Sequence, residues 1–449
     1  MNRMFIKCLN ISGDVIERLD AYFKKLFSLR EVENNRGLIL VYAVLLINIW
    51  VFMNSAYYYL KSGVYQTSCW PFITWCGPIQ DAILFNNYLY LRPAVLAFLL
   101  FLFVVSSIAL IKNKIGLSFI FSFLICLFWL FPIFIFTNNY NDLIHHQHHY
   151  LFYVLLIIFF ARHSRIQLLI VFYALTYFFS SIPKFTSDTW LLGFVKAPYI
   201  PIVLLPFGTI FVILVQLILP YFLLFGSRYI RISAAIFFEA FHIYLAAIGS
   251  VGYSFFWITV PMIYILFCEY YERPSADTFR GNSLTTSVFV LFCFLSLVRL
   301  IIPGDDQYTM EGSGYALNMF NTATVDVIDY QDKLGKNSTS TLFLTGYSGL
   351  LQDLQKNCID ERERSLRIDR VSAYDKYEVV NENNYCKLTY KPFWHNDWIN
   401  PRLVYQDMSK LNAVQQFILE YKDFIHLSYL TIFILLSFLI ISKLFSNNK

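Results

Sequence analysis

The stretch IPIVLLPFGTIFVILVQLILPYFLLFG, residues 200–226, contains no Asp, Glu, Lys, Arg or His. About 20 consecutive apolar residues in a helix cross the hydrocarbon core of a bilayer, so this stretch predicts a membrane-spanning helix. The rest of the chain has a similar character, because 57% of its 449 residues are hydrophobic and only 14% are charged. This composition is not that of a water-soluble domain and indicates a polytopic membrane protein.

Several other segments carry the same apolar signal. One of them, 148–161, is short, and 232–250 and 255–271 are joined by a tight turn, so we expect about 8 to 10 spans. The predicted fold class is a polytopic α-helical membrane protein with one extracytoplasmic β-rich α+β domain before the last span. The candidate spans are 38–60, 93–111, 116–137, 148–161, 166–183, 200–226, 232–250, 255–271, 286–302 and 425–442.

The basic residues predict the orientation of the spans. Lys and Arg in short loops are retained on the cytoplasmic side of a membrane, and all basic loops fall on that side if the N-terminus is cytoplasmic. The first 36 residues carry seven Lys and Arg and no cleavable apolar region. We therefore interpret residues 1–37 as an amphipathic cytoplasmic segment and 38–302 as a multi-helix membrane domain.

The block 303–424 is the one extended polar region of the chain. It holds 18 Asp and Glu against 13 Lys and Arg, and the orientation above places it outside the cytoplasm. Residues 323–347 alternate around a polar turn, which predicts a β-hairpin. Residues 407–424 have a helical pattern and lead into a C-terminal transmembrane helix with a short cytoplasmic tail, 425–449.

Cysteine usage is consistent with an oxidising compartment on the outer side. Cys69, Cys76, Cys358 and Cys386 all fall in the segments predicted to lie there. Four cysteines allow three pairings, and spacing alone does not choose among them. Four free thiols are the alternative.

Ionisable residues at membrane depth are costly and mark candidate sites. Lys184 lies at the outer end of 166–183, while Glu239 and His242 are three residues apart and share one helix face. The simpler interpretations are a lysine that snorkels to the headgroups and a satisfied interhelical hydrogen bond. If Lys184 is instead held among apolar groups, desolvation disfavours its ammonium form, and a neutral amine can act as a base.

A histidine cluster, HHQHH, begins the candidate span at 148–161. Its H-x-x-H-H spacing occurs in di-iron membrane desaturases, but two irons need about eight imidazole ligands in several such motifs. The other histidines of this chain are scattered without that spacing. We therefore predict no metal site, and interpret the cluster as the outer mouth of a buried site. The cluster consists of His145, His146, His148 and His149.

Several short motifs, in this order, resemble the vitamin K-dependent γ-glutamyl carboxylase and its bacterial relatives, the horizontally transferred transmembrane domain (HTTM) family. HHYLFYVLLIIFFA resembles a span start of that family and aligns its functional histidine with His148. TYFFSSIPKFTSDTWLLG resembles the helix end that carries the catalytic lysine, here Lys184. FEAFHIYLAAIGSVGYSFF is similar to the helix that carries His242. The resemblance covers roughly residues 38–410, and departs from the pattern at Ser181 and Pro183.

The resemblance implies an enzyme that uses reduced vitamin K or menaquinol, with oxygen and carbon dioxide as co-substrates. Lys184 would deprotonate the quinol, and His148 would orient or relay the proton. The reduced cofactor then drives carboxylation, or a related modification, of an extracytoplasmic peptide or other acidic substrate. We assign contacts with the cofactor to His242, Glu239, Phe178 and Phe179.

The resemblance also implies a disulfide between Cys69 and Cys358, which would tie the first outer loop to the polar domain. It places the protein in the cytoplasmic membrane of a bacterium. The expected partners are membrane lipid, a lipid-borne quinone and a secreted peptide or protein; no nucleic acid is expected.

Two other functions fit the sequence in part. A non-enzymatic or accessory membrane protein for maturation or export of a secreted peptide toxin would share the same motifs. A small secreted peptide encoded beside the gene would favour that role, whereas a neighbouring quinone-epoxide reductase would favour the enzyme. A transporter is not supported, because the sequence shows neither an inverted repeat nor paired broken helices.

Overall fold

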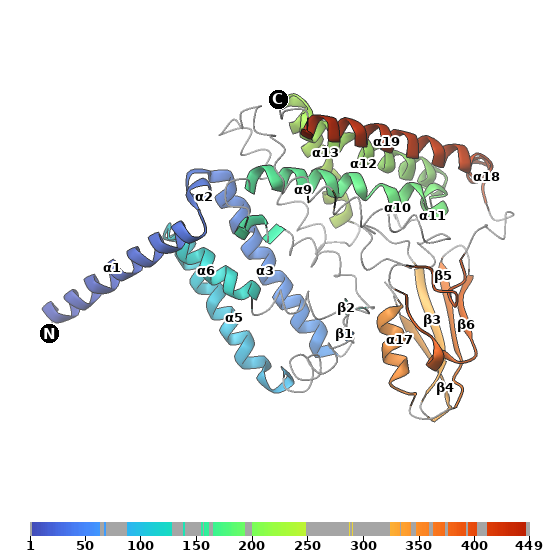
Figure 1. Cartoon of the computed structure of the whole chain (residues 1–449), viewed down its shortest axis with the longest axis horizontal. Coiled ribbons are helices and arrows are strands. Elements are labelled where there is room, and N and C mark those ends of the chain that lie inside the picture. The colour runs from blue at the N-terminus through green and yellow to red at the C-terminus, as the bar shows by residue number, and fades with distance from the viewer. Residues whose placement is uncertain are drawn as a thin grey trace.

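The computed structural model is mostly helical where it describes the chain, with a small antiparallel sheet. Figure 1 shows the helices of residues 36–125 in one group, those of residues 165–247 and 422–445 in another, and the sheet with a short helix beside it. The residues that the structure describes are 2–62, 67–68, 88–127, 138–139, 154–155, 157–160, 165–193, 200–247, 287, 290, 324–332, 334–342, 347–358, 362–372, 376–391, 394–401 and 411–445.

The N-terminal third forms long helices. They are α1 (Asn2–Leu26), α2 (Arg30–Asn34), α3 (Arg36–Ser62), α5 (Tyr88–Ile111) and α6 (Ile115–Ile125). A buried hydroxyl cluster joins three of them: the Tyr42 hydroxyl lies 2.6 Å from Ser122 Oγ, and Ser106 Oγ lies 2.8 Å from the same atom. Hydrogen bonds between small polar side chains are a usual way of joining helices where water is absent.

A second group of helices packs around α12. The group contains α9 (Arg165–Phe179), α10 (Ile182–Phe185), α11 (Asp188–Leu191), the 3-10 turn η3 (Ile202–Leu204), α12 (Leu205–Phe225), α13 (Arg228–Ala247) and α19 (Lys422–Phe445). Helix α12 contacts α9, α13 and α19. The fully apolar stretch that predicted a span is thus the centre of this group.

Three helical stretches in the described part of the chain are long and apolar enough to cross a membrane: Leu168–Phe185, Ile202–Phe225 and Lys422–Ser442. The first is almost wholly buried inside the protein, whereas most residues of the third are only partly buried or exposed, as expected for a helix that faces lipid on one side. Shorter apolar helices are found at Arg36–Trp50, Ala97–Ile111 and Ile115–Ile125. The predicted span 255–271, and all of 286–302 except residues 287 and 290, lie outside the described residues.

The polar block contains a four-stranded antiparallel sheet in the order β4-β3-β5-β6. Its strands are β3 (Thr324–Gln331), β4 (Asn337–Leu342), β5 (Leu366–Ser372) and β6 (Lys376–Glu382). The hairpin predicted at 323–347 is confirmed as β3 and β4, with Val327 opposite Thr341. Asp332 Oδ1 closes the turn by accepting from the amides of Leu334 and Lys336, and Gly335 takes a φ of +75°, a conformation that favours glycine.

Helix α17 (Ser348–Gln355) packs on the sheet through a compact apolar core. Its members include Ile328, Leu351, Ile368 and Tyr385, each less than 4% exposed. The short ladder of β1 (Thr67–Ser68) and β2 (Asn138–Asn139) is antiparallel, and β1 contacts α17.

The disulfide pairing differs from the expected one. Cys358, just after α17, is bonded to Cys386 in the 3-10 turn η6 (Tyr385–Lys387), with 5.8 Å between their Cα atoms. A sulfur atom forms one disulfide, so the expected bond from Cys69 to Cys358 is wrong, and Cys69 itself lies outside the described residues. The observed bond ties the helix of this unit to its own sheet, because both ends of the bond belong to one hydrophobic core.

The helix predicted within 407–424 is confirmed from Ala413 onward as α18 (Ala413–Glu420), which leads into α19. Asn412 starts it with a capping box: its side chain accepts from the Gln415 amide at 2.9 Å, and the Gln415 side chain accepts from the Asn412 amide at 3.1 Å. This arrangement satisfies amide groups that a helix start otherwise leaves unpaired.

Arg165 joins the start of α9 to the turn after α1. Its buried guanidinium donates to the carbonyl oxygens of Ile158 at 2.6 Å, Ser28 at 3.0 Å and Phe27. The turn between α5 and α6 lies at the same end, where Lys114 pairs with Glu17 of α1. Arg165 and Lys114 thus both contact α1 or the turn that follows it.

Candidate functional site

The break between α9 and α10 creates the polar part of the candidate site. Pro183 has no amide hydrogen and follows a residue that it restricts, so the regular helix ends at Phe179. The hydroxyl of Ser180 donates to the Tyr177 carbonyl at 2.8 Å, and that of Ser181 donates to the Phe178 carbonyl at 2.6 Å. The backbone at the break is therefore satisfied from within the segment.

Lys184 is fully buried at this break. Its Nζ donates to the carbonyl oxygen of Ser180 at 2.8 Å and lies 5.3 Å from the centre of the Trp190 ring, over its face. The indole face attracts a cation electrostatically, and the carbonyl oxygen accepts a hydrogen bond from the amine. The amine is therefore turned inward and does not snorkel to the surface, which was the simpler interpretation of a lysine at the end of a span.

Three phenylalanines around the lysine pack against the C-terminal helix. Phe178 stacks on Phe433 with ring centres 4.7 Å apart, Phe179 meets the same ring edge-on at 5.7 Å, and Phe185 stacks on Tyr429 at 6.0 Å. All three phenylalanines are buried. Phe178, Phe179 and Phe185 thus form one apolar layer with Tyr429 and Phe433 of α19.

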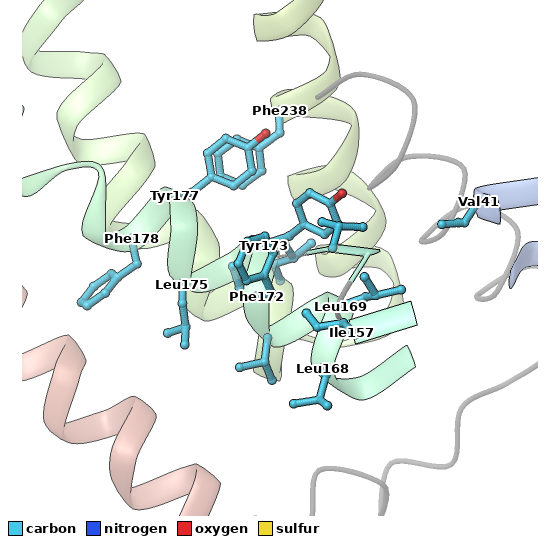
Figure 2. Close-up of a cluster of buried hydrophobic side chains, with 14 of the residues drawn as sticks. Val41, Ile157, Leu168, Leu169, Phe172, Tyr173, Leu175, Tyr177, Phe178 and Phe238 are labelled. Atoms are coloured by element: carbon cyan, nitrogen blue, oxygen red, sulfur yellow. The ribbon is translucent and has the colours of Figure 1, made fainter. Parts of the chain in front are cut away.

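On another side of α9, Tyr177 connects to α13. The Tyr177 hydroxyl lies 2.6 Å from His242 Nε2, and its ring stacks on Phe238 with centres 3.9 Å apart. Figure 2 shows Tyr177 and Phe178 leaving α9 in different directions, Tyr177 toward Phe238 and Phe178 toward α19. His242 thus forms the interhelical hydrogen bond that was the simpler interpretation, and Glu239, one turn away, is only half-buried.

Polar contacts fix α18 and the start of α19 over the lysine segment. Gln415 Nε2 donates to the Leu192 carbonyl at 2.7 Å in a buried position. Lys422 pairs with Asp188 at 3.2 Å, and His426 Nε2 lies 3.9 Å from the same carboxylate. The short segment after Lys184 is therefore held between its own helix and the C-terminal one.

The structure brings together part of the predicted site. Lys184 lies at the break that follows Phe178 and Phe179, and the Tyr177 bond connects His242 to the same stretch of α9. His148 and the other histidines of its cluster lie outside the described residues, so their position relative to Lys184 stays a prediction.

Four residues beside the Lys184 segment were not predicted from the sequence: Tyr177, Trp190, Tyr429 and Phe433. The four-residue spacing of Tyr429 and Phe433 places them on one face of α19, which is a signal for an aromatic stripe. Nothing in that spacing identifies the helix that the stripe packs against. Only the folded arrangement assigns it to Lys184.

No group of three or more His, Cys, Asp or Glu side chains within the described residues is arranged to hold a metal ion. No family model matches the chain, and neither the curated proteins nor the solved structures contain a match.

The position of the Lys184 amine suits it to accept a proton. Burial among apolar groups disfavours the ammonium form of an amine, and a neutral amine can take up a proton from a weak acid. The ammonium that results is stabilised by the Ser180 carbonyl and the Trp190 ring. Water is kept away by the aromatic rings of α9, α10 and α19.

Proposed function

We propose that the chain is an integral membrane enzyme resembling the vitamin K-dependent carboxylases, in which Lys184 accepts a proton from a reduced quinone. The observation that supports this most is the position of Lys184: its amine is fully buried, lies over Trp190 and is hydrogen-bonded to Ser180. A lysine with only a structural task at the end of a span is expected to extend toward water. A position among aromatic rings suits a lysine that accepts a proton from a bound quinol.

The residues present fit a quinone in character. Flat aromatic side chains suit a planar ring, and one buried amine suits an acidic hydroxyl group. When bound, a quinol would supply the electrons for reduction of oxygen and the driving force for removing a carbon-bound proton. Lys184 would receive the hydroxyl proton, with the Ser180 carbonyl and the Trp190 face holding the ammonium.

Other residues exclude water from the amine and fix the helices around it. The packing of Phe433 on Phe178 and Phe179 shields the site from water, which strengthens electrostatic interactions inside it. The bond between Tyr177 and His242 fixes α13 against α9. His148 remains the proposed partner that orients the proton.

We further propose that the sheet of β3 to β6 lies outside the cytoplasm of a bacterium, with the N-terminus inside. The disulfide between Cys358 and Cys386 supports the first part, because such bonds persist in oxidising compartments. The contacts of Lys114 and Arg165 with α1 and the turn after it support the second, because basic residues in short loops are retained in the cytoplasm. An acidic side chain of a secreted peptide would then approach from the side of the sheet and receive carbon dioxide.

The test is oxygen-dependent epoxidation of reduced vitamin K or menaquinol by the purified protein in lipid nanodiscs. Lys184→Ala removes the amine, and Lys184→Met removes it while keeping the volume of the side chain. Lys112→Ala, at an exposed turn, is the matched control and should retain full activity. Size-exclusion profiles and the intact disulfide report whether each variant is folded.

Epoxide formed by wild type and by Lys112→Ala, but not by either Lys184 variant, would support the proposal. Partial rescue of Lys184→Ala by added methylamine would separate a proton-accepting role from a packing role. If the folded wild type forms no epoxide with either quinol, the proposal is overturned. Epoxide formation by Lys184→Met at the wild-type rate would overturn the role of the lysine alone.

A further inference from the structure

Helix α1 contacts the start of α6 and the turn before it with its polar side. The Asp20 carboxylate accepts from the Leu117 amide at 3.1 Å, and Glu17 pairs with Lys114. Gly116 permits the close approach: a Cβ atom there would lie 2.3 Å from the Asp20 carbonyl oxygen and 2.8 Å from the Lys24 amide nitrogen. The polar face is therefore the one that is seated on the start of α6.

The apolar side of the same helix points away from the protein. Its side chains are large and are each at least 44% exposed, and they recur every three or four residues, so they form one stripe along the helix. A helix that packs on a water-soluble core buries such a stripe, and here the arrangement is reversed. The residues of this stripe are Val15, Ile16, Leu19, Tyr22 and Leu26.

Cations border the stripe. Arg18 and Lys25 are both exposed and are seven residues apart, on one line of the helix. Neither makes an ion pair within the described part of the chain, in contrast to Lys24, which pairs with Asp20 at 2.9 Å. The stripe thus has an apolar centre and unpaired positive charge at one edge.

We propose that α1 lies in the headgroup region of a membrane leaflet that contains anionic lipid, with its apolar stripe against the acyl chains and Arg18 and Lys25 on the phosphates. Amphipathic helices with this division of residues bind at such interfaces. Figure 1 shows α1 extending from the end of the helical body, next to α2 and α6. It is tied there to the turn that precedes α6, one of the shorter apolar helices.

A second copy of the chain is a poorer occupant for the stripe. In a symmetric dimer the basic edge of one copy would lie near the basic edge of the other, and like charges at an interface are unfavourable. Anionic headgroups complement both the apolar centre and the basic edge. The inference does not depend on the function proposed for Lys184.

The test uses the full-length protein in vesicles with and without phosphatidylglycerol. Photoreactive p-benzoylphenylalanine replaces Leu19 on the stripe, or Asp14, which is exposed and lies off the stripe one turn before Arg18, as the matched control; Ile16 is a second stripe position. Mass spectrometry then identifies whether each probe has joined to lipid or to protein. We expect severalfold more lipid adduct from Leu19 and Ile16 than from Asp14.

The charge is tested separately with the double variant Arg18→Gln, Lys25→Gln. We expect lipid adducts at Leu19 to be enriched in phosphatidylglycerol over its share of the vesicle, and this enrichment to be lost in the double variant. Crosslinked dimers through Leu19, or equal lipid yields from Leu19 and Asp14, would overturn the interfacial placement. Unchanged enrichment in the double variant would overturn the role of the two cations.

Discussion

The ring of Phe433, on the last helix, stacks on the ring of Phe178 with 4.7 Å between their centres. These residues come from α19 and α9, which are far apart in the sequence, and the contact closes one side of the buried Lys184 segment. Gln415 of α18 contacts Leu192, and Lys422 at the start of α19 pairs with Asp188. The C-terminal helix is thus a structural part of the candidate site.

Replacing Phe433 with Ala should leave a cavity beside Phe178 and destabilise the protein by about 3 kcal/mol, the usual cost for a large buried aromatic residue. Thermal unfolding in detergent measures the loss. Phe438→Ala, on an exposed part of the same helix, is the control and should cause little change. Equal midpoints for both variants would show that the Phe433 packing contributes nothing.

Arg165→Lys should destabilise the protein although the charge is kept. The guanidinium donates to three carbonyl oxygens at once, and an ammonium does not reproduce that planar fork. Losing charged hydrogen bonds of this kind costs about 3 kcal/mol. The exposed Arg18→Lys substitution should leave the unfolding midpoint unchanged, and a midpoint of Arg165→Lys equal to wild type would contradict the structural role.

Cys386→Ser should lower the stability of the sheet unit by roughly 3 kcal/mol, because the unfolded chain regains freedom when the bond to Cys358 is absent. A reductant should have the same effect on wild type and no further effect on the variant. Peptide mapping under non-reducing conditions should recover Cys358 joined to Cys386. Recovery of Cys358 joined to Cys69 would refute the observed pairing.

The sheet unit should lose stability at alkaline pH through Tyr385. Burial, the largest cause, raises the pKa of Tyr385 above its ordinary value of 10.0, so the unfolded chain releases this proton at a lower pH than the folded one. The free energy of unfolding therefore decreases as the pH rises through about 10. Tyr385→Phe should flatten this dependence, measured by thermal unfolding between about pH 8 and pH 11.

The same variant has a cost at neutral pH. The Tyr385 hydroxyl donates to the Gln331 carbonyl at 2.6 Å, and loss of that bond should destabilise the unit by about 1 kcal/mol. Tyr22→Phe, at an exposed position on α1, is the control. An alkaline slope that is equally steep with and without Tyr385 would assign it to other tyrosines.

Local patterns in the sequence predict many elements of this fold. Uninterrupted apolar residues predict α12 and α19, alternation around a polar turn predicts the hairpin of β3 and β4, and the stretch that contains Lys184 identifies a candidate site. Each of these signals depends on neighbours within about 20 residues, which is the scale of hydrogen bonding in a helix or a hairpin. Helices α12 and α19 and the hairpin are found where they are predicted.

Tertiary structure decided which distant surfaces meet. Hydropathy does not distinguish a snorkelling Lys184 from a buried one, because the difference lies in Trp190 and in the α19 ring of Phe433 that covers the segment. Cysteine counting left the pairing open, and a shared core selected Cys386 for Cys358. Packing and pairing are short-range contacts between segments remote in the chain, so they follow from the arrangement of the helices and the sheet and not from any one segment.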